Sequence, residues 1–110
     1  MSVTHRGLYL AVVLSALYLA SDGAEAAAPD AHVTIQDSRF SPLQLTTKVG
    51  AAVTWTNADD EPHTVVSDSG RFRSGALETG KAYTHTFDEP GTYTVYCARH
   101  PQRLATILVQ

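Results

Sequence analysis

Apolar residues recur at every second position in short segments along this chain, and that alternation constrains its fold most strongly. Val33 and Ile35 form one pair, and Val53 and Trp55 form another, with threonines between them. A period of two with β-branched and aromatic residues is typical of half-buried β-strands. The other segments with the same pattern carry Leu43 and Leu45, Tyr83 and Phe87, Tyr93 and Val95, and Ile107 and Val109.

Turn-forming residues separate these segments, and no window beyond the N-terminal region has a helical period. Such breaks occur at Ser41-Pro42, Val49-Gly50, Asn57 to Pro62, Asp68 to Gly70, Thr79-Gly80 and Glu89 to Gly91. About seven or eight short strands in one small domain predict an all-β, antiparallel sandwich or barrel.

The first residues follow the three-part pattern of a secretory signal peptide. A start with one arginine precedes the charge-free run of 14 residues from Gly7 to Ala20, and the small-residue site Ala24-Glu25-Ala26 follows. A membrane anchor is the alternative, but a bilayer span needs about 20 apolar residues. We therefore predict a signal peptide over residues 1–26, cleaved after Ala26, and one domain over residues 27–110.

Composition limits what this domain can be. The chain has 110 residues, a net charge of −3 and one cysteine. A mildly acidic balance argues against nucleic acid as a partner, and one cysteine excludes an internal disulfide. Because so small a domain is only marginally stable by itself, a bound metal is the expected reinforcement.

One group of residues has the chemistry of a metal site. Cys97 ends a predicted strand in phase with Val95, and His100 follows three residues later. His63 begins another segment in phase with Val65, so a sandwich can bring it to the same place. A thiolate with two imidazoles suits copper better than calcium or magnesium. Two alternatives stay open: zinc at the same residues, or a buried cysteine that only fills space.

The chain resembles the small bacterial cupredoxins, closest to the amicyanin, plastocyanin and pseudoazurin group. The residues that carry this resemblance are Val49-Gly50, Val53 to Asn57, Pro62 to Val65, Phe72, Ser74-Gly75, Leu77, Gly80, Tyr83 to Phe87, Pro90 to Tyr93 and Tyr96 to Pro101. The resemblance implies a Greek-key β-sandwich and one blue-copper ion whose equatorial ligands fall on His63, Cys97 and His100. It also implies one-electron transfer in the periplasm with a dehydrogenase, cytochrome or oxidase as partner, and we expect a monomer.

The sequence departs from this family at the axial ligand. Members with this loop place a methionine three residues after the second histidine, whereas this chain has Arg103 there, and its one methionine is Met1. A protonated guanidinium offers no lone pair to a metal. Three outcomes follow: Leu104 or backbone fills the axial direction, Gln102 supplies an oxygen, or the site is weakened or lost.

The other titratable residues have simpler interpretations. We interpret His85 as a hydrogen-bonded core histidine and Asp59-Asp60-Glu61 as a solvated turn that could face a partner. Arg99 and Arg103 beside His100 could steer an acidic partner.

Two functions other than electron transfer remain open. One is a copper-binding protein that stores or delivers the ion, and the other is a metal-free interaction domain. An enzyme is not expected, because the sequence has no paired carboxylates near the site and no Ser-His-Asp pattern.

Overall fold

The computed structural model describes residues 29–110, so the predicted signal peptide lies outside the described part of the chain. Between residues 29 and 110, no helix is long and apolar enough to cross a membrane. This part of the chain is all β, as predicted. Its strands are β1 (Ala31–Gln36), β2 (Arg39–Ser41), β3 (Gln44–Thr47), β4 (Ala52–Asn57), β5 (Val66–Ser67), β6 (Ala82–Thr86), β7 (Gly91–Cys97) and β8 (His100–Val109).

The strands form two four-stranded sheets, in the orders β2-β1-β4-β6 and β3-β8-β7-β5. Two of the pairings, β1 with β4 and β3 with β8, are parallel, so the expectation of a purely antiparallel sandwich was wrong. The chain leaves the first sheet after β2, adds β3 to the second sheet and then returns as β4. This crossover brings β4 beside β1 in the same direction, which a hairpin cannot do.

The core lies between the sheets and consists of the residues that the alternation predicts. Val33, Val53, Trp55, Val95 and Ile107 are all buried. Trp55 is fully enclosed, and its ring centroid lies 6.0 Å from those of Phe72 and Tyr83. The alternation therefore assigns the inward face of most strands correctly.

Leu43 and His85 do not follow their predicted burial. Leu43 is 57% exposed and lies just before the first residue of β3, where its carbonyl accepts a hydrogen bond from the N–H of Thr106 while its side chain faces solvent. His85 is half-buried in β6 and stacks on Phe72, with ring centroids 4.2 Å apart. Packing against aromatic rings thus holds His85 in place.

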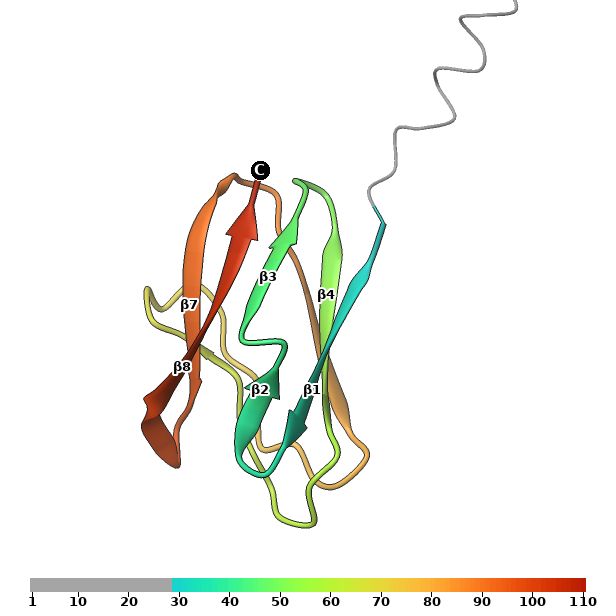
Figure 1. Ribbon diagram of the computed structural model, residues 1–110, viewed down its shortest axis with the longest axis vertical. Coiled ribbons are helices and arrows are strands. Elements are labelled where there is room, and N and C mark those ends of the chain that lie inside the picture. The colour runs from blue at the N-terminus through green and yellow to red at the C-terminus, as the bar shows by residue number, and fades with distance from the viewer. Residues whose placement is uncertain (1–28) are drawn as a thin grey trace, which may run out of the picture.

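The loops that matter for function gather at one end of the sandwich. In Figure 1, the β1–β2 turn and the β7–β8 turn lie at the end opposite the C-terminus, near the long segment that follows β4. Segments far apart in the sequence therefore meet at this end.

We predict that Trp55→Ala lowers the free energy of unfolding by roughly 3–5 kcal/mol, because it leaves a large cavity among aromatic rings. Denaturant unfolding of the metal-free protein measures this loss. Leu43→Ala is the control, and we expect it to change the free energy by no more than about 0.5 kcal/mol because Leu43 is exposed. Equal losses in the two variants would contradict this account of the core.

Candidate metal centre

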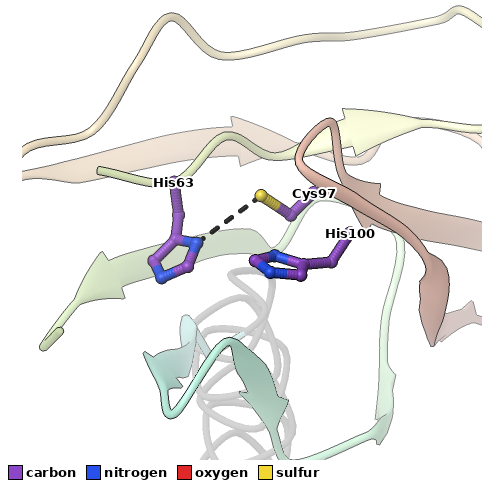
Figure 2. Close-up of side chains that lie close together, drawn as sticks. All are labelled: His63, Cys97 and His100. Atoms are coloured by element: carbon purple, nitrogen blue, oxygen red, sulfur yellow. Dashed lines mark hydrogen bonds between the residues drawn. The ribbon is translucent and has the colours of Figure 1, made fainter. Parts of the chain in front are cut away.

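The structure brings together the three predicted metal-ligating residues. Their potential ligand atoms all lie within 4.8 Å of one another. His63 comes from the segment between β4 and β5, Cys97 ends β7, and His100 begins β8. Figure 2 shows the sulfur of Cys97 directed toward the His63 ring, with the His100 ring on the same side of the cysteine. His63 Nδ1 lies 3.5 Å from this sulfur.

The β7–β8 hairpin sets the positions of Cys97 and His100. The two residues pair directly across the strands and are joined only by Ala98 and Arg99. The next pair is Tyr96 with Leu104, so residues 101–103 have no partner on β7 and form an irregularity. Cys97 is 3% exposed, which confirms the inward orientation predicted from its phase with Val95.

Backbone pairing with a distant segment holds His63. Its N–H donates to the carbonyl of Leu77 at 3.1 Å, and the N–H of Leu77 donates back at 2.7 Å. The buried side chain of Asn57 donates to the carbonyls of both Glu61 and Leu77, each at 2.8 Å. These bonds hold the segment before His63 against the rest of the sandwich.

Thr64 ties the two ligand-bearing segments together. Its N–H and hydroxyl both donate to the Cys97 sulfur, at 3.5 and 3.8 Å. The same hydroxyl oxygen accepts a hydrogen bond of 2.9 Å from the N–H of Ala98. One residue next to His63 therefore fixes the sulfur and the β7–β8 turn at once.

These hydrogen bonds change the acidity of the thiol. Burial raises the pKa of Cys97, but donors from Thr64, His63 and the Arg99 backbone outweigh it and lower that pKa to about 6. Burial alone would lower the pKa of His63, because it disfavours the charged imidazolium. The hydrogen bonds of His63 to Cys97 and Asp59 outweigh burial, and the pKa of His63 is raised overall. The buried cysteine therefore favours the thiolate, which is the form that binds metals.

His100 has an orphaned nitrogen at this centre. Its Nδ1 is buried and has no hydrogen-bond partner among the described residues. Such an atom costs about 1–3 kcal/mol, and a metal ion beside the thiolate would satisfy it. Two imidazoles and a thiolate fit copper, and zinc could use the same donors. His85 lies outside the cluster and is not a further ligand.

The segment after His100 presents its side chains outward. Gln102, Arg103 and Leu104 are all exposed, and Leu104 is 54% exposed. Arg103 Nη1 donates to the carbonyls of Asp37 and Ser38, at 3.2 and 3.3 Å. Its guanidinium therefore binds the β1–β2 turn.

Asp59 is a functional candidate that sequence reasoning missed. Its Oδ2 lies 2.7 Å from His63 Nε2, so the interpretation of residues 59–61 as a solvated turn is wrong for this residue. The backbone N–H of Ser38 holds the pKa of Asp59 below its usual value, against the opposing effect of burial. In the sequence, the one signal for this contact is that Asp59 lies four residues before His63. Asp60 and Glu61 are exposed, as predicted.

Comparisons with known proteins agree with this geometry. A family model described as the cupredoxin-like domain matches residues 9–109. Amicyanin-alpha of Methylorubrum extorquens is 33% identical over 91 residues, which cover 78% of this chain and 76% of the relative. A plastocyanin of Scenedesmus fuscus is 35% identical over 72 residues, which cover 56% of this chain and 74% of the relative.

The solved structures include a purple cupredoxin from Nitrosopumilus maritimus. It matches with a TM-score of 0.67 and 37% identity over 74% of this chain and 100% of the other. The family match and the His-Cys-His cluster together confirm copper as the expected cofactor. By sequence, by fold and by the residues gathered at its metal centre, this chain belongs to the cupredoxin-like domain family.

Proposed function

We propose that this protein is a type 1 copper protein that carries single electrons between periplasmic redox proteins. Its ligands are His63 Nδ1, Cys97 Sγ and His100 Nδ1. The observation that carries the proposal is the convergence of these three donors from two segments, with the thiol pKa lowered to about 6. Amicyanin and plastocyanin relatives support the same role.

The surroundings of the site suit electron transfer because they restrict movement. Bound copper would supply a change of one electron between its two oxidation states. The backbone bonds from Leu77 hold His63, and Thr64 holds the sulfur and the β7–β8 turn. Ligand atoms fixed in this way would move little when the charge of the copper ion changes.

His100 is the proposed exit for the electron. It is half-buried, whereas His63 is only 1% exposed, so His100 is the imidazole that reaches the surface. Arg99 and Arg103 are exposed on either side of it in the sequence. Two cations there would attract an acidic partner, with an effect that weakens as salt rises.

We propose that these three residues are the only side-chain ligands. Gln102 and Leu104 are exposed, and Arg103 binds the carbonyls of the β1–β2 turn. Losing a weak axial donor disfavours copper(II) more than copper(I). The reduction potential should therefore be higher than that of a methionine-ligated relative.

The first prediction from this proposed function concerns copper uptake. We expect the purified protein to take up one copper ion and show an intense blue or purple absorption with reversible one-electron cycling. Cys97→Ala should abolish the absorption, because the thiolate gives rise to it. His85→Ala is the matched control, since His85 lies outside the cluster, and it should keep the absorption. Tight copper(I) binding without colour would instead support storage or delivery, and no uptake would leave a metal-free interaction domain.

The second prediction concerns the thiol of the metal-free protein. Thiolate absorbance should rise with pH around a midpoint of about 6, because the folded state stabilises the ionised sulfur. Replacing the neighbouring imidazole in His63→Ala should move this midpoint upward, toward the ordinary thiol value near 9.0. His85→Ala should leave it in place. A wild-type midpoint close to 9.0 is the result that sinks this account of the sulfur's surroundings.

The third prediction concerns export. We propose that residues 1–26 direct the protein to the periplasm and are then removed. The support is the charge-free run before Ala24-Glu25-Ala26 in the sequence. Mass spectrometry of the protein from a periplasmic extract should give an N-terminus at Ala27. Full-length protein found only in the membrane fraction would favour an uncleaved anchor.

A further inference from the structure

The carboxylate of Asp59 accepts hydrogen bonds from two distant parts of the chain. Its Oδ1 accepts from the N–H of Asp37 at 2.7 Å, and its Oδ2 from the N–H of Ser38 at 2.9 Å. Oδ2 also lies 2.7 Å from His63 Nε2. The side chain of Asp59 is 12% exposed, so water has little access to this group.

The β1–β2 turn is built to hold such a carboxylate. Asp37 and Ser38 are its two central residues, and both have a positive φ, of 56° and 59°. Two successive left-handed residues form a tight hairpin turn, and here their N–H groups meet the same carboxylate. The turn therefore contacts Asp59 through its backbone.

The backbone of Asp59 is fixed as well. Its N–H donates to Asn57 Oδ1 at 2.8 Å, and its carbonyl accepts from the Thr79 hydroxyl at 2.6 Å. Asn57 is itself fully buried at the end of β4. The carboxylate is thus held from both sides and presents a fixed oxygen to His63.

A fixed acceptor at Nε2 determines which nitrogen of His63 faces the sulfur. The Nε2–H donates to Asp59, which leaves Nδ1 directed at Cys97, 3.5 Å away. A carboxylate on the far nitrogen fixes the ring orientation of a metal-ligating histidine and makes it a better donor.

The opposite side of the same turn binds Arg103. The carbonyls of Asp37 and Ser38 accept from Arg103 Nη1, while their N–H groups donate to Asp59. One turn in the first sheet thus connects the support of His63 to the segment that follows His100.

We propose that Asp59, held by the Asp37–Ser38 turn, is a positioning residue that orients His63 for copper and favours copper(II). This proposal rests on the proposed function, because it assigns His63 Nδ1 to the metal. The negative charge of Asp59 acts on the copper through the imidazole, and it stabilises the oxidation state with the higher positive charge.

The experiment compares Asp59→Asn with Asp60→Asn. Both variants lose one negative charge, but Asp60 is exposed and one residue away from the hydrogen-bonded carboxylate. Asn has one acceptor oxygen for three donors, so Asp59→Asn must lose at least one of them. We expect its copper affinity to fall by roughly 10–100-fold, with a higher reduction potential. Asp60→Asn should remain close to the wild type in both properties.

An NMR measurement separates this role from a general effect on folding. In the wild type loaded with copper(I), the His63 Nε2–H should exchange slowly with solvent, and in Asp59→Asn it should exchange faster, because a neutral amide oxygen is a weaker acceptor than a carboxylate. Thermal unfolding of the metal-free variants shows whether each is folded. A folded Asp59→Asn that matches Asp60→Asn in affinity, potential and exchange overturns the proposal.

Two further results have a defined meaning. If Asp59→Asn does not fold, the wild type still decides, because rapid exchange of its His63 Nε2–H overturns the proposal. If the wild type takes up no copper, the proposed function fails. The hydrogen bond is then judged from the same exchange measurement on the metal-free wild type and Asp59→Asn.

Discussion

The pairing of Cys97 with His100 across a two-residue turn is the constraint on which the metal centre depends. It places a thiol and an imidazole side by side at the end of the longest hairpin, where β7 and β8 are anchored in the core. Such a turn leaves the two side chains little freedom, so a rigid sandwich can hold them before any metal binds. His63 then needs only to be brought across from the segment after β4, and its paired hydrogen bonds with Leu77 do this.

Much of the fold, and the meeting of His63, Cys97 and His100 in the candidate site, could be predicted because they depend on local patterns. The phase of Cys97 with Val95 fixed the inward direction of its sulfur, and both residues are buried. The parallel pairing of β1 with β4 has no local signal, because it depends on where the chain returns after visiting the other sheet. The contacts of Asp59 were missed for a related reason, although its position four residues before His63 is a local signal. Its partners at Asp37 and Ser38 lie more than 20 residues away, and they bind it through backbone N–H groups that any residue offers.

Arg103 shows how a fold can accept a cation near a metal site. A guanidinium beside copper would be repelled and would also lose its hydration, because burying a charge without a partner is costly. Here the two turn carbonyls accept from Nη1, and the side chain stays exposed. Both costs are avoided without losing the arginine. The β1–β2 turn can bind Arg103 because its N–H groups point toward Asp59 and its carbonyls point the other way. The carbonyls are therefore free to accept hydrogen bonds from the guanidinium.

A domain of this size without a disulfide has few ways to hold its loops together. With copper bound as proposed, His63 and Cys97 become linked across 34 positions of sequence, at the end of the sandwich opposite the C-terminus (Figure 1). Because the unfolded chain does not preform these donors, binding favours the folded state, by about 2.7 kcal/mol when free ligand is a hundredfold above its dissociation constant. That gain is large beside the marginal stability of a small domain. The hydrogen bonds from Thr64, Leu77 and Asp59 still have to hold the donors in the metal-free protein. A site that relied on the metal for its shape would change shape with the charge of the metal, and a carrier of single electrons cannot tolerate that.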